Sequence, residues 1–392
     1  MSNKMERIYL DYAATTPVDE RVFQSMLPYF CEVFGNPSSA HSFGQAAEAA
    51  LEDARYSIAH SLNCRADEII FTSCGTESDN LALRGAAHAR RRKTGANHLL
   101  ISPVEHHAVS HTVRQLAELE GFRWETLPVV GTGMVDPAAV EAAIRPETAL
   151  VSVIYANNEI GTINPIQEIA AVCRRKGVLF HTDAVQAAAH LPMNVERDGV
   201  DLLAIGAHKF YGPKGIGVLY VRHGLDIFPT QTGGRQENGL RAGTHNIPYI
   251  VGLAEALRLA QAEQEQRSQR QMKLRDLIFE RVLAEIPLSR ISGHPTRRLT
   301  NHASFAFERV DGNRLLMMLD MAGFACSSGS ACKVGTPQVS EVLTAIGLPP
   351  GWGLGSLRVS LGKDTTRAEV EAFLRVLPEI VQRVRQSEGR NG

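Results

Sequence analysis

Short apolar segments alternate with amphipathic helical segments along residues 45–221, and this alternation most constrains the fold. The apolar segments have the length and composition of buried strands, and helical patterns such as 45–62 and 110–120 stand between several of them. A chain of this kind folds as an α/β protein whose mainly parallel sheet is covered by helices on both faces. The segments expected as strands are 68–73, 97–102, 122–128, 148–155, 177–183, 200–207 and 215–221.

The C-terminal part of the chain has a different pattern. A helical and highly charged stretch from about Ile250 to Ile286 predicts a bridge between two domains. Strand-like and helical segments beyond it predict a small α+β domain, completed by N-terminal residues. Because 392 residues exceed what one core usually supports, we expect a large domain over 15–258 and a smaller one over 1–14 with 259–392.

Charge and composition exclude several classes of function. The 41 basic and 42 acidic residues leave a net charge of -1, which gives no general attraction to nucleic acid or to an anionic membrane. No apolar run approaches the roughly 18 residues of a membrane span, and the first residues lack the apolar core of a signal peptide. We therefore expect a soluble, cytoplasmic protein that acts on a small molecule and keeps its six cysteines reduced.

An acid and a lysine follow two of the expected strands. Asp183 would be partly buried and would need a cation, either a protonated pyridine nitrogen or an ordinary salt-bridge partner. Lys209 precedes a glycine-rich turn; it is either an inert surface lysine or an amine whose pKa is lowered in a desolvated pocket. This pair is typical of a pyridoxal phosphate site, in which the lysine holds the cofactor aldehyde. Gln186 could face the same pocket and reach the ring oxygen.

Two further segments follow expected strands. Gly75 and Thr76 open a helix, where backbone N–H groups either bind a phosphate or simply form an N-terminal cap. His106 could lie flat over a bound ring. His107 and His111 stand four residues apart, which leaves zinc binding as an alternative, although no third ligand is obvious.

The remaining candidates bind the substrate or act on it. Asn157 and Asn158 emerge at a strand end, where they bind a ligand or make turns. Arg358 suits a substrate carboxylate, with a salt bridge on an edge strand as the alternative. Cys332 lies among small polar residues beside Lys333, which suits a reactive thiol, whereas Cys326 resembles a core residue.

Nine segments occur in an order that identifies a family. The chain resembles the cysteine desulfurases of the NifS/IscS type, in the class V aminotransferase group of fold type I pyridoxal phosphate enzymes. The resemblance implies a large domain with a seven-stranded sheet between helices and a smaller α+β domain that carries the catalytic cysteine. It also implies removal of sulfur from L-cysteine, giving L-alanine and a persulfide on Cys332. The segments are YLDYAATTP, FGNPSSAHSFG, FTSCGTESDN, EHHAV, ANNEIGT, HTDAVQ, AHKFYGPKGIG, GLRAGTHN and SSGSAC.

The same resemblance implies roles for individual residues. Catalysis falls to Cys332, Lys209 and His106, and no metal is implied. Pyridoxal 5'-phosphate is held by Lys209, Gly75, Thr76, His106, Asn158, Asp183, Gln186 and His208, and by Thr244 acting in the neighbouring subunit of a homodimer. The substrate is bound by Asn158 and Arg358, with Asn36 near the same pocket. The segment from Cys332 to Val342 is similar to the loop that delivers persulfide to a sulfur acceptor, either an iron–sulfur scaffold protein or a tRNA thiolation partner.

Three positions depart from the family pattern. Gly206 replaces a serine that binds the phosphate, so cofactor binding is weaker or water takes over that task. Arg235 replaces a glycine near the dimer side of the pocket. Cys326 is a second sulfur relay or a core residue. A plain aminotransferase, a selenocysteine lyase and an inactive sulfur carrier stay as alternative functions.

Overall fold

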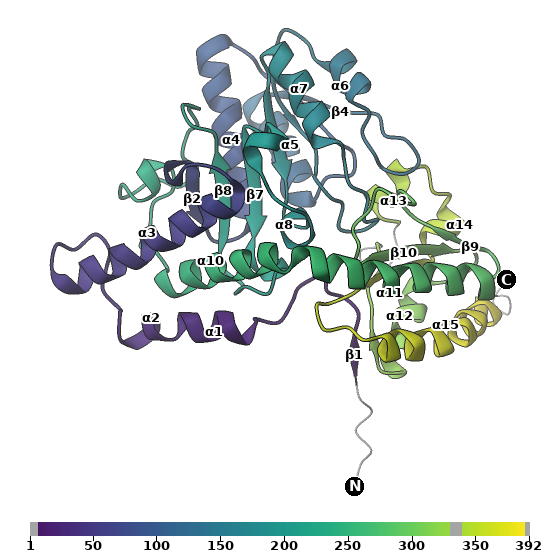
Figure 1. The fold of residues 1–392 in the computed structure, drawn as a ribbon. Helices are drawn as coiled ribbons and strands as arrows, with labels where there is room; N and C mark the ends of the chain where they lie inside the picture. Colours follow the sequence, from purple (N-terminus) through teal and green to yellow (C-terminus); the bar gives the residue numbers. More distant parts are fainter. Residues whose placement is uncertain (1–6, 330–338, 389–392) are drawn as a thin grey trace.

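The computed structural model describes residues 7–329 and 339–388. A seven-stranded sheet lies at the centre of its larger part, in the order β2-β8-β7-β6-β5-β3-β4 (Figure 1). Strand β8 is antiparallel to both of its neighbours, and the other adjacent strands are parallel, so the mainly parallel sheet expected from the sequence is confirmed. The strands are β2 Ile69–Thr72, β3 His98–Ile101, β4 Arg123–Thr126, β5 Thr148–Ser152, β6 Leu179–Asp183, β7 Leu202–Gly206 and β8 Gly217–Val221.

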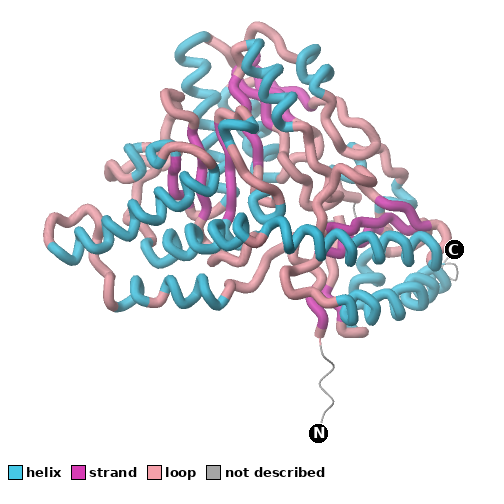
Figure 2. Tube along the Cα trace, in the orientation of Figure 1, coloured by secondary structure: helices cyan, strands magenta, loops and turns pink. Residues whose placement is uncertain are grey.

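Helices cover both faces of this sheet (Figure 2). Helices α4 and α5 pack on one face, and α3, α7, α8 and α10 lie on the other. The helices of this part are α1 Glu20–Met26, α2 Pro28–Cys31, α3 Ser42–Leu62, α4 Gly75–Thr94, α5 His107–Glu120, α6 Pro137–Ala143, α7 Ile166–Lys176, α8 Ala187–His190, α9 Val195–Asp198 and α10 Ile247–Ala262, with short 3-10 turns at Ala66–Glu68, Ala207–Lys209 and Glu237–Gly239.

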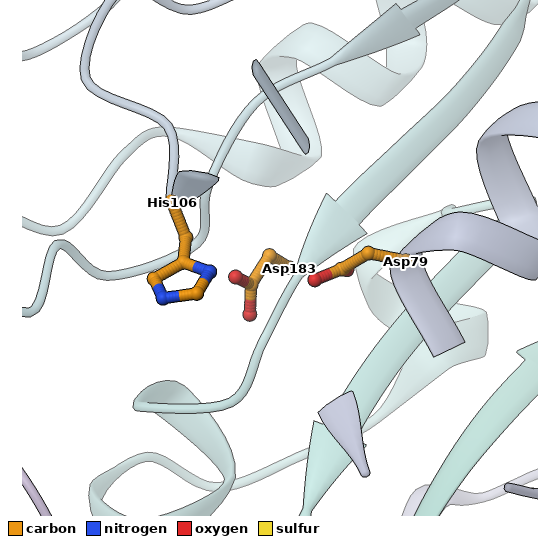
Figure 3. A group of neighbouring side chains, drawn as sticks. All are labelled: Asp79, His106 and Asp183. Carbon is orange, nitrogen blue, oxygen red and sulfur yellow. The ribbon is translucent and has the colours of Figure 1, made fainter. Parts of the chain in front are cut away.

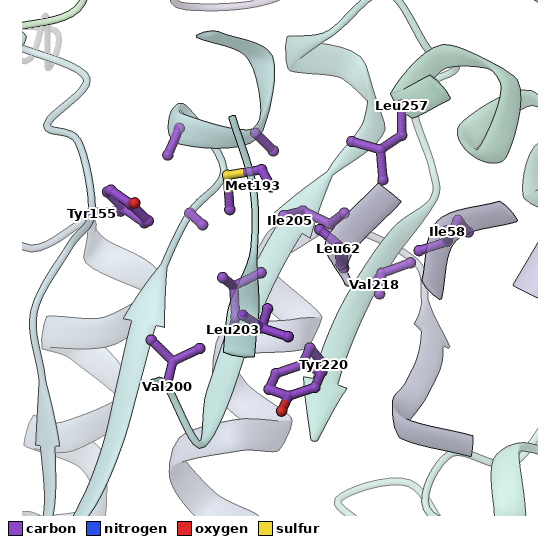
Figure 4. Packing of buried hydrophobic residues seen from close by; sticks show 14 of the residues in the cluster. Ile58, Leu62, Tyr155, Met193, Val200, Leu203, Ile205, Val218, Tyr220 and Leu257 are labelled. Atoms are coloured by element: carbon purple, nitrogen blue, oxygen red, sulfur yellow. The ribbon is translucent and has the colours of Figure 1, made fainter. Parts of the chain in front are cut away.

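Alternate side chains of strand β7 belong to different cores. Leu203 and Ile205 of β7 join the cluster under α3 and α10, together with Ile58 and Leu257 (Figure 4). Leu202 points the other way, into the cluster under α4 and α5. Because side chains alternate across a strand, a nearly continuous apolar run such as β7 fits a sheet that is buried on both faces.

A second, smaller unit has its own core. Leu10 joins that core with residues from Leu274 onward. Strand β1 pairs in parallel with β11, and β12, β10 and β9 form an antiparallel sheet in that order. The domain limits 1–14, 15–258 and 259–392 stay a prediction. The elements are β1 Ile8–Tyr9, α11 Gln264–Glu285, β9 Ser289–Ile291, β10 His302–Phe307, α12 Gly312–Met321, β11 Phe324–Ala325, α13 Glu341–Ala345, α14 Pro350–Gly353, β12 Ser356–Ser360 and α15 Arg367–Glu388.

Two local expectations need correction. The segment 122–128 is not a buried strand: β4 is the edge strand, and most of its side chains are exposed. The charged stretch around residue 263 holds two helices, because α10 ends at Ala262 and α11 begins at Gln264, with Glu263 between them. Among the described residues, no helix combines the length and apolar character that crossing a bilayer requires.

Candidate active site

The ends of the parallel strands form one side of a cavity of about 220 Å³. Strands β2, β5, β6 and β7 each deliver polar residues there, as ligand sites in α/β sheets commonly do. The lining brings together eight of the predicted site residues. They are Gly75, Thr76, His106, Asn158, Asp183, Gln186, His208 and Lys209.

One end of the cavity is the N-terminus of α4. Cys74 caps this helix without a side-chain hydrogen bond, so the backbone N–H groups of the first turn are available to an anion. Gly75 is required for close packing, since a Cβ there would stand 2.6 Å from Val185 Cγ2. Gly206 lies beside it: a Cβ at Gly206 would be 3.3 Å from Gly75 N. A side chain at residue 206 would therefore border the anion site directly.

His208 also borders this end of the cavity. Its Nδ1 lies 3.2 Å from Thr15 Oγ1. Burial and the neighbouring Lys209 lower the pKa of His208 to about 4, so the imidazole is neutral near pH 7 and offers a hydrogen bond rather than a charge.

The Lys209 amine is held by two backbone carbonyls. Its Nζ donates to Ala13 O at 2.8 Å and to Ala14 O at 2.6 Å. Burial lowers the pKa of Lys209 to about 8, and Arg358 lowers it further by repulsion. Much of the amine is therefore neutral at a slightly alkaline pH, as a nucleophile or base requires.

Asp183 lies in a cluster of buried carboxyl groups. Its Oδ1 accepts the Val185 N–H at 2.9 Å, and no described cation forms an ion pair with it. Asp79 lies close behind it (Figure 3), and burial raises the pKa values of Asp79, Asp183 and Glu105. Such a cluster needs protons or a cation.

His106 completes the polar lining near Asp183. Its Nδ1 accepts the Ala108 N–H at 3.1 Å as the N-terminal cap of α5, so the neutral ring carries its proton on Nε2. Burial lowers the pKa of His106, which favours that neutral form. Gln186 commits one amide N–H to Ala13 O at 2.8 Å and keeps the other.

A cation could also be bound by this cluster. Among the described residues, only Asp79, His106 and Asp183 form a group of three with ligand atoms within 4.8 Å of one another. His107 and His111 stack with ring centroids 4.6 Å apart, and no third described ligand joins them. The zinc alternative therefore gains no support from these two histidines.

Arg358 does not line the cavity but contacts Asn158, which does. Its Nη1 donates to Asn158 O at 2.9 Å, and its Nη2 donates to Asp11 Oδ1 at 2.8 Å. The salt-bridge alternative for Arg358 is confirmed, and its role as the ligand of a substrate carboxylate stays a prediction.

Three predicted residues lie apart from this cavity or outside the described residues. Asn36 is exposed, and its Oδ1 accepts the Ser38 N–H at 2.9 Å in a local turn. Thr244 is also exposed. Cys332 lies outside the described residues. Cys326 packs against the smaller core, as its sequence context suggested, and burial raises the pKa of its thiol.

The sequence prediction missed several residues of the site. Asp79 belongs to the quoted segment FTSCGTESDN and Asp11 to YLDYAATTP, but nothing in the residue pattern marked these two acids as site residues. The carbonyls of Ala13 and Ala14 could not be recognised either, since a backbone acceptor leaves no trace in residue identity.

Comparisons with known proteins agree with this arrangement. Residues 8–373 match the family described as "Aminotransferase class-V". The chain is 46% identical over 385 residues to a cysteine desulfurase IscS of Methanosarcina thermophila, covering 98% of this chain and 94% of that protein. It is 45% identical over 378 residues to a cysteine desulfurase IscS of Dictyoglomus turgidum, covering 96% and 95%.

Solved structures show the same likeness. A NifS-like protein matches with a TM-score of 0.89 at 36% identity, covering 96% of this chain and 99% of that one. A structure described as SspA in complex with cysteine matches with a TM-score of 0.79 at 36% identity, covering 91% and 99%.

Proposed function

Because the chain belongs to the class-V aminotransferase family and its relatives are cysteine desulfurases, we propose that it removes sulfur from L-cysteine with pyridoxal 5'-phosphate as cofactor. The observation that carries the proposal is the convergence of Lys209, Asp183 and the α4 N-terminus on one cavity. A cytoplasmic location belongs to the same proposal.

The residues of the cavity fit this cofactor. Asp183 would pair with the protonated ring nitrogen, which supplies the cation that the buried carboxyl cluster lacks among its described neighbours. The first turn of α4, with Gly75, Thr76 and the neutral His208, would hold the phosphate. His106 would lie over the ring, and the free amide N–H of Gln186 would reach the ring oxygen.

The chemistry is divided between the cofactor and the protein. When bound, pyridoxal phosphate supplies an aldehyde for an amine and a ring that accepts the electron pair left at the substrate Cα. The neutral Lys209 amine takes the Cα proton. The Cys332 thiolate attacks the substrate sulfur, so an S–S bond forms while the Cβ–S bond breaks. The electron pair of the broken bond passes to Cβ, which takes up a proton carried by His106 Nε2. Lys209 returns to Cα the proton that it took, and the product leaves as alanine.

The residues on either side of the Cys332 segment support its role. The backbones of Ser327 and Arg358 exchange two hydrogen bonds, of 3.2 Å and 2.7 Å. On the other side, the Ser340 hydroxyl donates to Glu159 beside a cavity of about 160 Å³ that His106 and Asn158 also line. We propose that the persulfide passes from here to an iron–sulfur scaffold protein or a tRNA thiolation partner.

A homodimer belongs to this proposal. Aromatic side chains are exposed along α1, α2 and α3, with Phe30, Phe34 and Phe43 showing 49%, 64% and 56% of their surface. An apolar surface of this kind favours a partner. Arg235 lines a separate cavity of about 500 Å³, and Asn36 and Thr244 are sequence neighbours of other residues that line it. We propose that Thr244 reaches the phosphate of the other subunit.

The test measures alanine and enzyme-bound persulfide after incubation with cysteine. Cys332→Ala should lose both products, and Lys209→Ala should lose both as well. Sulfide or alanine production that survives in Cys332→Ala would instead support a lyase or an aminotransferase. Purified protein that does not take up pyridoxal phosphate, judged by its visible absorbance, would support the inactive sulfur carrier.

A further inference from the structure

Asp11 and Arg358 form a largely buried ion pair next to Asn158, which lines the cavity. The pair is 2.8 Å long, and its side chains are only 19% and 8% exposed. Arg358 Nη1 is already bonded to Asn158 O. Arg358 Nε is buried and has no partner among the described atoms. The Nε–H group therefore stays available to a ligand, while Nη2 donates to Asp11.

The segment that contains Asp11 also supplies two backbone carbonyls that accept hydrogen bonds from an amine. Asp11 is followed within three residues by Ala13 and Ala14, whose carbonyls hold the Lys209 amine. The attraction of Asp11 raises the pKa of Lys209, opposing the effect of burial. One short segment thus supplies a negative group to the guanidinium and two carbonyls to Lys209.

A free α-amino acid carries both charges that this pair carries. An incoming carboxylate alone would take the Arg358 guanidinium and leave Asp11 buried without a cation, which is costly. An incoming amine alone would take Asp11 and leave the Arg358 guanidinium buried without an anion. A molecule with both groups leaves neither charge unpaired.

We propose that Asp11 and Arg358 exchange partners when an α-amino acid enters, so that Arg358 binds its carboxylate and Asp11 binds its α-ammonium group. Asp11 is then a specificity-determining residue that selects zwitterions and guides the substrate amine toward Lys209. This inference rests on the proposed function, in which Arg358 binds the substrate carboxylate.

The test compares L-cysteine with 3-mercaptopropionate, which has the thiol and the carboxylate but no ammonium group. The KM for cysteine is measured by alanine formation, and the Kd of 3-mercaptopropionate by titration calorimetry, both on the cofactor-loaded enzyme. In Asp11→Asn the ratio of Kd to KM should fall about tenfold or more, since a lost charge-assisted bond is worth at least that factor. An unchanged ratio would overturn the exchange.

Control variants separate the possible failures. Asp11→Glu keeps the charge and should keep the ratio, and Asp11→Ser provides a second neutral variant if Asp11→Asn does not fold. Asp67→Asn removes a carboxylate whose ion pair with Arg65 is exposed and should leave both constants unchanged. Arg358→Gln should raise the KM for cysteine. If it does not, the proposed carboxylate site is itself wrong; if it does while Asp11→Asn keeps the wild-type ratio, only the exchange is wrong.

Discussion

His181 Nε2 lies 3.4 Å from Oδ1 of Asp79, one of the two aspartates that line the cavity. Both side chains are buried, and the other ring nitrogen of His181 is 2.9 Å from Ser152 Oγ. Burial lowers the pKa of His181 to about 3 and raises that of Asp79 well above its ordinary value, with the charge of Asp183 adding to the effect. The pKa of Asp183 is raised as well, by burial, but His106 and Lys209 oppose that effect, so Asp79 keeps a proton more readily than Asp183 does.

This difference predicts opposite results for two isosteric variants. Asp79→Asn should bind pyridoxal phosphate with an affinity within about threefold of the wild type, because the amide replaces the carboxyl group of the pair that keeps a proton more readily. Asp183→Asn should lose about tenfold or more, because it removes the charge that pairs with the ring nitrogen. Cofactor Kd values from visible absorbance titrations test both. Equal losses in the two variants would contradict this assignment of charge.

The pKa of Lys209 predicts the pH dependence of cofactor attachment. Because that pKa is lowered to about 8, the neutral fraction of the amine rises as the pH increases toward 8 and is nearly complete about one unit above it. The rate of pyridoxal phosphate attachment to the apoenzyme, followed by stopped-flow absorbance, should rise to about pH 9 and then level off. Lys214→Ala, which changes an exposed lysine of the same loop, should give the same profile. A rate that climbs steadily to pH 10.5 would mean an unperturbed amine.

The contact at Gly75 predicts a clash that a second change relieves. Gly75→Ala would place a methyl group 2.6 Å from Val185 Cγ2 and should weaken cofactor binding about tenfold, since overpacking costs about 1–3 kcal/mol. The double variant Gly75→Ala with Val185→Ala should recover most of the affinity. Val185→Ala alone is the control. A double variant as weak as Gly75→Ala would mean that the alanine acts on the helix terminus rather than on Val185.

Burial of Cys326 predicts an unreactive thiol. Because burial raises its pKa, only a minute fraction of Cys326 is thiolate at pH 8, and iodoacetamide should modify it far more slowly than the exposed Cys31. Cys326→Ala should keep wild-type persulfide formation. Mass spectrometry of cysteine-treated protein provides the check, and persulfide found on Cys326 would restore the relay hypothesis.

The fold was largely predictable because its sheet is buried on both faces. Apolar runs such as those of β5 and β7 mark the strands directly. The edge strand β4 was misjudged because its partly apolar sequence resembles a buried strand, while its position at the edge depends on the strand order. The break at Glu263 also escaped prediction, since no glycine or proline marks the end of α10.

The candidate site was predictable where a residue follows a strand. Asp183 and Lys209 met that rule, and the cavity brings them together. Asp79 did not, because it lies inside α4 and nothing in the sequence shows that the helix directs it toward Asp183. The ion pair of Arg358 with Asp11 joins residues 347 positions apart and depends on the tertiary fold alone.

That separation bears on how the protein is made. Asp11 and Thr16 are synthesised well before their partners, because His208 lies 192 positions after Thr16 and Arg358 lies 347 positions after Asp11. The large sheet can form during translation before Arg358 is made. The proposed substrate site is completed only when β12 emerges, so chains that stop before β12 lack the ion pair of Asp11 with Arg358.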